Sequence, residues 1–311
     1  MNLQQIDYVI AVSKYHNFQL AADSCNITQS TLSTMIGKLE DEIGIKIFDR
    51  KTKPVTLTKE GNHILAQLKK ITQEVGNLKE ITQNLKGEIS GTINIAVIPT
   101  IAPYLLPLFI NDFIKKYPSV KFSISELTTS KIIENIKKRE IDIAIVSLPL
   151  EDKNLIEIPL YDEHFVVYNH QESARTSMDI DELDTEKLWL LEEGHCMRNQ
   201  IVNICNSNRL KNGIHNNLEY KSGSINTLLK FVNLNKGTTL LPYLSTLDFS
   251  REEQNKIVEI NGPKLARSIG LVVHPHFIKK KILNSLKEEI MNNIPIDIKK
   301  NRDEKIIFSP L

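Results

Sequence analysis

Residues 18–50 read FQLAADSCNITQSTLSTMIGKLEDEIGIKIFDR, and this stretch decides the fold of the first part of the chain. A short helix is predicted over residues 18–25, followed by a tight turn at residues 26–27. Thr28 is a good N-cap for a second helix over residues 29–39, which has an apolar inner face. Another amphipathic helix precedes this stretch, so the pattern predicts a helix-turn-helix arrangement.

The outward face of the predicted 29–39 helix carries short polar side chains that can approach base edges in a DNA major groove. These side chains are Gln29, Ser30, Thr31, Ser33, Thr34 and Lys38. An ordinary solvated helix face has the same composition, so the helix alone leaves both interpretations open. The next segment favours DNA, because residues 46–59 hold five basic side chains against one acid and are predicted to form a β-hairpin wing. Arg50, Lys51 and Lys53 are its candidate phosphate contacts.

A long stretch without proline follows the wing and carries apolar residues at steps of three and four. They are Ile64, Leu68, Ile71, Val75, Leu78, Ile81 and Leu85. This spacing is typical of a coiled-coil seam. Such a helix can also pack on its own domain, but its length and polar opposite face favour pairing with a second copy of the chain.

The remaining two hundred residues show strand and helix patterns in alternation. Strands are predicted at residues 93–97, 120–124 and 141–148, with helices at 104–116 and 131–138 between them. This order implies a mainly parallel sheet covered by helices. The pattern repeats further along the chain, so we expect two α/β lobes.

The predicted crossings between the lobes lie near Tyr161 and Arg267. Ligands of such folds bind in the cleft between lobes, at the carboxyl ends of strands. Thr100 and Thr129 each follow a predicted strand and are candidates for this cleft. Capping the next helix is the commoner role of a lone threonine, and that alternative stays open here.

Two of the three cysteines of the 311-residue chain lie close together, in GHCMR at residues 194–198 and at Cys205. A thiol beside positive charge has a lowered pKa, and the thiolate is the reactive form. The segment from Cys196 lacks Gly and Pro and can form a helix, which would hold the two thiols on opposite faces, about 13.5 Å apart along the axis. A disulfide would then require unfolding, as in a redox switch. Alternatively, both are reduced, inert apolar residues.

Composition excludes several other classes of protein. The formal charge is +1, with 25% charged and 41% apolar residues, which is an ordinary globular balance. The sequence shows neither a signal peptide nor 18 consecutive apolar residues, so we expect a cytoplasmic protein without a membrane partner. The eight histidines show no metal-ligand spacing, and neither a P-loop nor a GxSxG motif is present, so no metal or cofactor is expected.

The third cysteine, Cys25, lies at the end of the predicted 18–25 helix. Cys25 is expected to be a buried structural thiol.

Four motifs in the first sixty residues resemble the winged helix-turn-helix of LysR-type transcriptional regulators. They are FxxAA from residue 18, TQSxLS from residue 28, LExExGxxxFxR from residue 39 and LTxxG from residue 57. Further motifs resemble the peroxide-sensing members of that family, over essentially the whole chain to about residue 295. They are IPTxxPYLLP from residue 98, LLExGHCxRxQ from residue 190 together with Cys205, and RxIGLV from residue 267.

The resemblance implies an α/β fold with a winged helix-turn-helix domain (residues 1–58), a dimerising linker helix (59–88) and a two-lobed regulatory domain shaped like periplasmic binding proteins. We place lobe I at residues 91–161 and 268–300, and lobe II at residues 162–267. The tail at 301–311 lies beyond the resemblance, and no order is expected there. The implied partners are promoter DNA, a second copy of the chain in a homodimer, a homotetramer, and RNA polymerase.

The resemblance also implies roles for individual residues. Cys196 matches the peroxide-reactive thiol and Cys205 the resolving thiol, which condense to a reversible disulfide through a sulfenic acid. Thr100, Thr129, His195 and Arg267 match the polar shell that holds peroxide. The predicted function is therefore a transcriptional regulator of the oxidative-stress response that senses hydrogen peroxide, and not an enzyme. Two alternatives are a LysR-type regulator that binds a small organic effector between its lobes and a thiol peroxidase, which would leave the first sixty residues unexplained.

Overall fold

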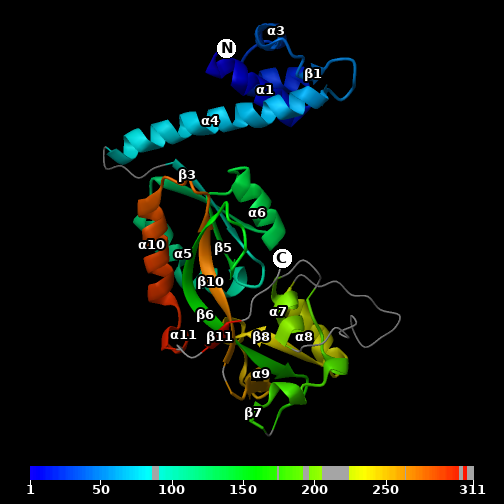
Figure 1. Cartoon of the computed structure of the whole chain (residues 1–311), viewed down its shortest axis with the longest axis vertical. Coiled ribbons are helices and arrows are strands. Elements are labelled where there is room, and N and C mark those ends of the chain that lie inside the picture. Colours follow the sequence, from blue (N-terminus) through cyan, green and yellow to red (C-terminus); the bar gives the residue numbers. More distant parts are fainter. Residues whose placement is uncertain are drawn as a thin grey trace. The chain divides into compact units, whose positions relative to one another are not determined.

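The computed structural model shows two compact units, Met1–Ile89 and Ser90–Leu311 (Figure 1). It describes residues 1–85, 91–173, 175–191, 196–204, 224–262, 264–300 and 304–306.

The first unit is a helical domain with a small wing. Its elements are α1 (Leu3–Tyr15), α2 (Phe18–Ser24), α3 (Gln29–Ile43), β1 (Phe48–Asp49), β2 (Thr56–Leu57) and α4 (Lys59–Leu85). The predicted helix-turn-helix is confirmed: Asn26 adopts the left-handed conformation in the turn, and the Thr28 hydroxyl accepts from the Thr31 amide at 3.3 Å. The wing is confirmed by the antiparallel pairing of β1 with β2. Helix α3 runs four residues beyond the predicted end and stops at Gly44, whose φ of +70° suits glycine.

The long helix α4 packs on its own unit at its start and leaves its apolar seam uncovered further on. Leu65 and Leu68 are buried in the core of the first unit. Ile71 and Leu78 are 37% and 62% exposed. Packing on its own domain is therefore confirmed for the first turns of this helix, while pairing with a second copy stays a prediction, to which the exposed Ile71 and Leu78 are suited.

The second unit alternates strands and helices. Its first half contains β3 (Gly91–Val97), α5 (Ala102–Lys116), β4 (Val120–Glu126), α6 (Thr129–Lys137), β5 (Ile143–Leu148) and β6 (Ile156–Asn169). The following residues form β7 (Ser177–Met178), η1 (Ile180–Glu182), η2 (Thr185–Lys187), α7 (Cys196–Ile204), α8 (Ile225–Leu234), β8 (Thr238–Pro242), η3 (Tyr243–Thr246), α9 (Arg251–Gln254) and β9 (Ile257–Ile260). The last elements are β10 (Lys264–Val273), α10 (Lys280–Asn293), α11 (Ile296–Lys300) and β11 (Glu304–Ile306).

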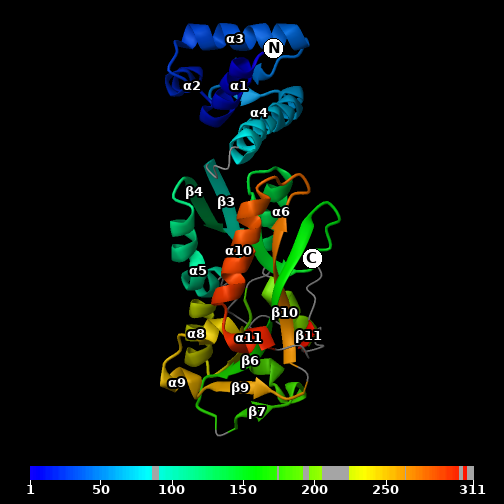
Figure 2. The same cartoon turned by 90° about the vertical axis from the view of Figure 1, so that its left-hand side faces the viewer.

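The strand order is β4-β3-β5-β10-β6-β9-β7, with β8 paired to β6 and β11 to β10. The predicted parallel sheet is confirmed for β4, β3 and β5 but is wrong beyond them, because β10 runs antiparallel to both β5 and β6. Each of the two long strands β6 and β10 continues from one half of the unit to the other (Figure 1), so both are longer than the predicted segments. Helices α5 and α10 lie side by side (Figure 2) on one flank of this sheet, with α6 on the other (Figure 1).

A second hydrophobic core lies around β6, β8 and α8 and takes in the short helix α7. Met197 and Ile201 of α7 are fully buried there, together with Trp189, the one tryptophan of the chain. The predicted helix after Cys196 is thus confirmed as Cys196–Ile204. In the tail, residues 304–306 form β11 against β10, so the expectation of no order is wrong for these residues. Among the described helices, none is both long enough and apolar enough to cross a membrane.

A substitution at Gly270 on β10 tests how closely the central strands approach each other. A Cβ atom there would lie 2.3 Å from Leu148 Cδ1 and 2.6 Å from the Ile158 carbonyl oxygen. We expect Gly270→Ala to lower the free energy of unfolding of the second unit by about 1–3 kcal/mol. Urea unfolding of the full chain, followed by Trp189 fluorescence, measures this. Gly76→Ala on α4, where a Cβ meets nothing within 4 Å, is the control and should leave the Trp189 transition unchanged.

Candidate functional site

A buried ion pair joins β6 to β10 in the second unit. Arg267 and Glu163 are cross-strand partners, and both side chains are almost fully buried, at 1% and 0% exposure. Arg267 Nε donates to Glu163 Oε2 at 2.9 Å, and Nη2 lies 2.8 Å from the same oxygen. Glu163 Oε1 accepts from the backbone amide of Leu244 in η3 at 2.9 Å. Both carboxylate oxygens are therefore satisfied, as a buried carboxylate requires.

The guanidinium of Arg267 also holds Thr100, which follows β3. Its Nη1 donates to Thr100 Oγ1 at 2.9 Å, and its Nη2 donates to the Thr100 carbonyl oxygen at 3.1 Å. Thr100 does not cap α5, whose N-cap residue, Ile101, makes no side-chain bond. Because Thr100 Oγ1 accepts from arginine, which cannot act as an acceptor, the hydroxyl proton of Thr100 remains available for donation to a ligand.

Thr129 is the first residue of α6 and is 4% exposed. Its hydroxyl is buried and finds no hydrogen-bond partner among the residues that the structure describes. It does not cap its helix, since Thr128 is the N-cap residue and makes no side-chain capping bond. A buried hydroxyl without a partner costs free energy, so an unfilled hydrogen-bond position at Thr129 indicates a place for a ligand or water.

Helix α7 begins at Cys196, which places the predicted sensor residue at the positive end of a helix dipole. The Cys196 side chain, His195 and Cys205 lie outside the described residues. Arg198 Nη1 donates to the Leu191 carbonyl oxygen at 3.1 Å. One turn into the helix, Gln200 Nε2 donates to Ser147 Oγ of β5 at 3.0 Å, so α7 of one lobe is tied to the sheet of the other.

Glu163, Ser147 and Gln200 were missed as site residues by the sequence analysis. An available signal was Glu163 itself, a carboxylate two residues before the apolar run of β6 at residues 165–168. Its arginine partner lies 104 residues later, so no local pattern could connect the two.

Two tyrosines lie near the ion pair. Burial raises the pKa of Tyr104 on α5 to about 12, with Arg267 opposing and Glu163 adding to the shift. Burial also raises the pKa of Tyr161 on β6 well above its usual range, and its hydroxyl has no hydrogen-bond partner within the described part of the chain. Both phenols are therefore neutral at physiological pH.

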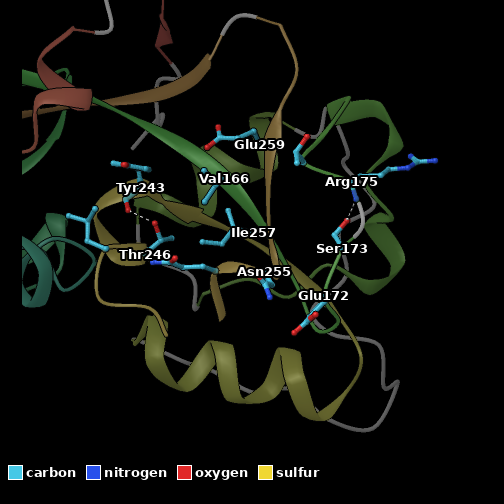
Figure 3. Close-up of a pocket in the computed structure, with 12 residues that line it drawn as sticks. Val166, Glu172, Ser173, Arg175, Tyr243, Thr246, Asn255, Ile257 and Glu259 are labelled. Atoms are coloured by element: carbon cyan, nitrogen blue, oxygen red, sulfur yellow. Dashed lines mark hydrogen bonds between the residues drawn. The ribbon is translucent and has the colours of Figure 1, made fainter. Parts of the chain in front are cut away.

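A separate cavity of about 590 Å³ lies in the other half of the unit, over β6, β9 and η3 (Figure 3). Val166 and Ile257 lie near its centre, with Tyr243 and Thr246 on one side and Glu259 at its edge. It contains none of the predicted site residues. Its lining is mixed, with apolar, acidic, basic and amide side chains, and does not select one ligand chemistry.

The predicted DNA-contacting surface of the first unit is formed by α3 and the wing. Most of the predicted DNA-contacting side chains are exposed, and Ser33 is half-buried. The exposed ones are Gln29, Ser30, Thr31, Thr34, Lys38, Arg50, Lys51 and Lys53. Cys25, expected to be buried, is only partly so and packs against the core of this unit.

Arg50 and Ser33 bond to each other, which sequence reasoning did not foresee. Arg50 Nη1 donates to Ser33 Oγ at 2.9 Å, and Nη2 lies 3.3 Å from Glu40 Oε2. Glu40 is buried, and its other oxygen accepts from the amides of Ile47 and Phe48 at 2.8 and 3.2 Å. The carboxylate of Glu40 thus joins α3 to the start of the wing.

The chain matches two family models. Residues 3–62 match the bacterial regulatory helix-turn-helix protein, lysR family, and residues 86–290 match the LysR substrate binding domain. Within the described residues, no group of three or more His, Cys, Asp or Glu side chains could hold a metal ion.

Curated relatives and solved structures resemble most of the chain. It is 32% identical over 278 residues to the hydrogen peroxide-inducible genes activator of Haemophilus influenzae, covering 88% of this chain and 91% of the relative. It is likewise 32% identical to the DNA-binding transcriptional dual regulator OxyR of Escherichia coli, covering 88% and 90%. A full-length OxyR with a cysteine-to-aspartate substitution from Pseudomonas aeruginosa has a TM-score of 0.73 at 27% identity, covering 94% and 99%. A peroxide-bound OxyR cysteine mutant from Corynebacterium glutamicum has a TM-score of 0.60 at 25% identity, covering 94% and 92%.

Glu40→Ala tests the buried carboxylate of the first unit. Removing it leaves two buried backbone amides without an acceptor and Arg50 without its carboxylate partner. We therefore expect the free energy of unfolding of this unit to fall by about 2–4 kcal/mol. Hydrogen exchange of residues 1–85 in the full chain measures it. Asp41→Ala removes the neighbouring exposed carboxylate and should cost less than about 1 kcal/mol. Equal losses in the two variants would contradict the role given to Glu40.

Proposed function

The chain belongs to the LysR family of bacterial transcriptional regulators, and we propose that it is a peroxide-responsive member whose Cys196 is the sensor. The observation that carries the proposal is the contact of Arg267 with Thr100, together with the bond from Gln200 of α7 to Ser147, whose cross-strand partner Ile269 lies two residues from Arg267. The sequence also contains the GHC motif and Cys205. The Haemophilus influenzae relative named for hydrogen peroxide and the peroxide-bound Corynebacterium glutamicum structure support it. As a LysR-type regulator, the protein is not an enzyme.

The proposed chemistry starts at the Cys196 sulfur. Its thiolate attacks one oxygen of hydrogen peroxide, the O–O bond breaks, and the departing hydroxide takes a proton and leaves as water. The Thr100 hydroxyl is suited to donate a hydrogen bond to the departing oxygen, which takes its proton from solvent, and Thr129 offers a further hydroxyl to hold the peroxide. The Cys205 thiol then attacks the sulfenic acid, which releases a second water and forms a disulfide. Peroxide is reduced and the two thiols are oxidised, so the electrons balance.

Helix α7 makes this oxidation a conformational signal. Cysteines nine residues apart cannot meet while an intervening helix persists. Disulfide formation must therefore extract Met197 and Ile201 from their core or break the Gln200–Ser147 bond. Rearrangement of α7 would then reach the DNA-binding unit through the arrangement of the chains.

The proposed partners follow from the surfaces of the first unit. The exposed face of α3 enters the major groove of promoter DNA, with Lys51 and Lys53 on phosphates. The uncovered seam of α4 from Ile71 onward pairs two copies, so that two recognition helices bind two half-sites. Assembly into a tetramer and contact with RNA polymerase are further parts of this proposal. A regulator of transcription acts where the chromosome lies, which we take to be the bacterial cytoplasm.

Peroxide is expected to produce an intramolecular Cys196–Cys205 disulfide, detected by non-reducing peptide mass spectrometry after a low dose. Trp189 lies seven residues before Cys196, packed against Phe231, so its fluorescence should change with the same rate constant. Cys196→Ser and Cys205→Ser should each abolish both the disulfide and the change in Trp189 fluorescence, and Cys25→Ser should abolish neither. Absence of the link in the parent protein would overturn the proposal.

Two kinds of variant are expected to distinguish residues that contact DNA phosphates from residues that contact the bases. Lys51→Ala and Lys53→Ala should each reduce the slope of log affinity against log salt by about 1. Gln29→Ala should weaken binding to a duplex selected from a random pool by roughly tenfold while leaving non-specific binding unchanged. Fluorescence anisotropy measures both, with Lys121→Ala on β4 as the control. An unaltered preference in the Gln29 variant would remove that residue from the recognition surface.

A further inference from the structure

Arg267 presents a choice between two physical roles. An isolated guanidinium near Cys196 would attract the thiolate and lower the pKa of the thiol. A guanidinium whose charge is already compensated would act on the thiolate only as a dipole, while its N–H groups could still orient neighbouring acceptors.

The contacts of Glu163 favour the second role. Its carboxylate lies within 3 Å of two nitrogens of Arg267, and both groups are excluded from water. The amide of Leu244 fixes the other carboxylate oxygen, so the carboxylate cannot swing away from the arginine. One N–H of Arg267 Nη1 donates to the Thr100 hydroxyl, and the second N–H of Nη1 has no partner among the described residues.

We propose that Glu163 is a positioning residue for the peroxide reaction: it cancels the charge of Arg267 and fixes the guanidinium, so that Nη1 orients the Thr100 hydroxyl and offers its remaining N–H to peroxide. This inference rests on the proposed function. It assigns stabilisation of the thiolate to the N-terminus of α7. Arg267 then acts by geometry, because peroxide is a neutral ligand whose oxygens are held by hydrogen bonds from fixed donors.

The titratable groups around Glu163 and Arg267 do not interfere with a pH titration of the Cys196 thiol. Tyr104 from α5 and Tyr161 from β6 stay neutral below pH 9, because burial raises the pKa of each. Asp248, just after η3, acts on Tyr104, and His164 adjoins Glu163 on β6.

The test uses two readouts on the full chain with Cys25→Ser and Cys205→Ser as background, so that Cys196 is the one thiol. The pH midpoint of iodoacetamide alkylation reports the charge felt by the thiol. The rate of sulfenic acid formation with peroxide, trapped with dimedone, reports the positioning of peroxide. Glu163→Gln leaves Arg267 uncompensated, so the alkylation midpoint should fall by about one pH unit. Arg267→Gln leaves the carboxylate, so the midpoint should rise.

The double variant Glu163→Gln/Arg267→Gln decides between the roles, and it buries no unpaired charge if a single variant fails to fold. We expect its alkylation midpoint to equal that of the background protein, while its rate with peroxide falls at least about tenfold. A midpoint raised as far as in Arg267→Gln would show that Arg267 acts as a free cation and would overturn the inference. An unchanged rate with peroxide would overturn it as well. Failure of the background protein to react with peroxide would instead contradict the proposed function, and the alkylation midpoints would still decide the charge.

Discussion

The pairing of Glu163 with Arg267 sits where the two long strands of the regulatory unit pass between its halves. On one side of this point β10 pairs with β5, and on the other β6 pairs with β8 and β9. A buried ion pair is tolerated only when its remaining hydrogen-bonding groups are satisfied, and here Leu244 and Thr100 supply the partners. Removing one member would leave a buried charge, at a cost of about 3–5 kcal/mol. The same contacts that stabilise the crossing therefore fix the geometry of the candidate peroxide site.

Helix α7 is held against this rigid frame by weaker and more numerous contacts. Burial of an apolar side chain such as Met197 or Ile201 contributes about 1.5–3 kcal/mol, and a single neutral hydrogen bond such as Gln200–Ser147 about 1 kcal/mol. These contributions are large enough to keep the helix folded against thermal motion. They are also of the size that formation of a covalent bond can overcome, which is the property that a switch segment requires.

Sequence patterns predicted the elements whose causes are local. The Thr28 cap, the wing and the short helix after Cys196 follow from residues within a few positions of one another, and the structure confirms them. The antiparallel entry of β10 was not predictable, because strand direction between distant segments depends on the path of the whole chain. The role of Glu163 was missed for the same reason. The position of Thr100 just after a strand was predicted correctly. That its hydroxyl accepts from Arg267 and does not cap a helix could not be predicted, because Arg267 lies far along the chain. Cys205 and His195 remain predictions.

The first unit constrains how a signal can reach DNA. Glu40 joins α3 to Ile47, Phe48 and Arg50, and His16 at the end of α1 pairs through its backbone with Val55 at the wing. Recognition helix and wing therefore behave as one body. A change in α7 cannot readily reshape the surface that meets the bases without breaking this buried network. In the proposed switch, the quantity left to vary is the spacing and angle between the recognition helices of paired chains, and a change of a few ångströms there decides whether two half-sites can be bound together.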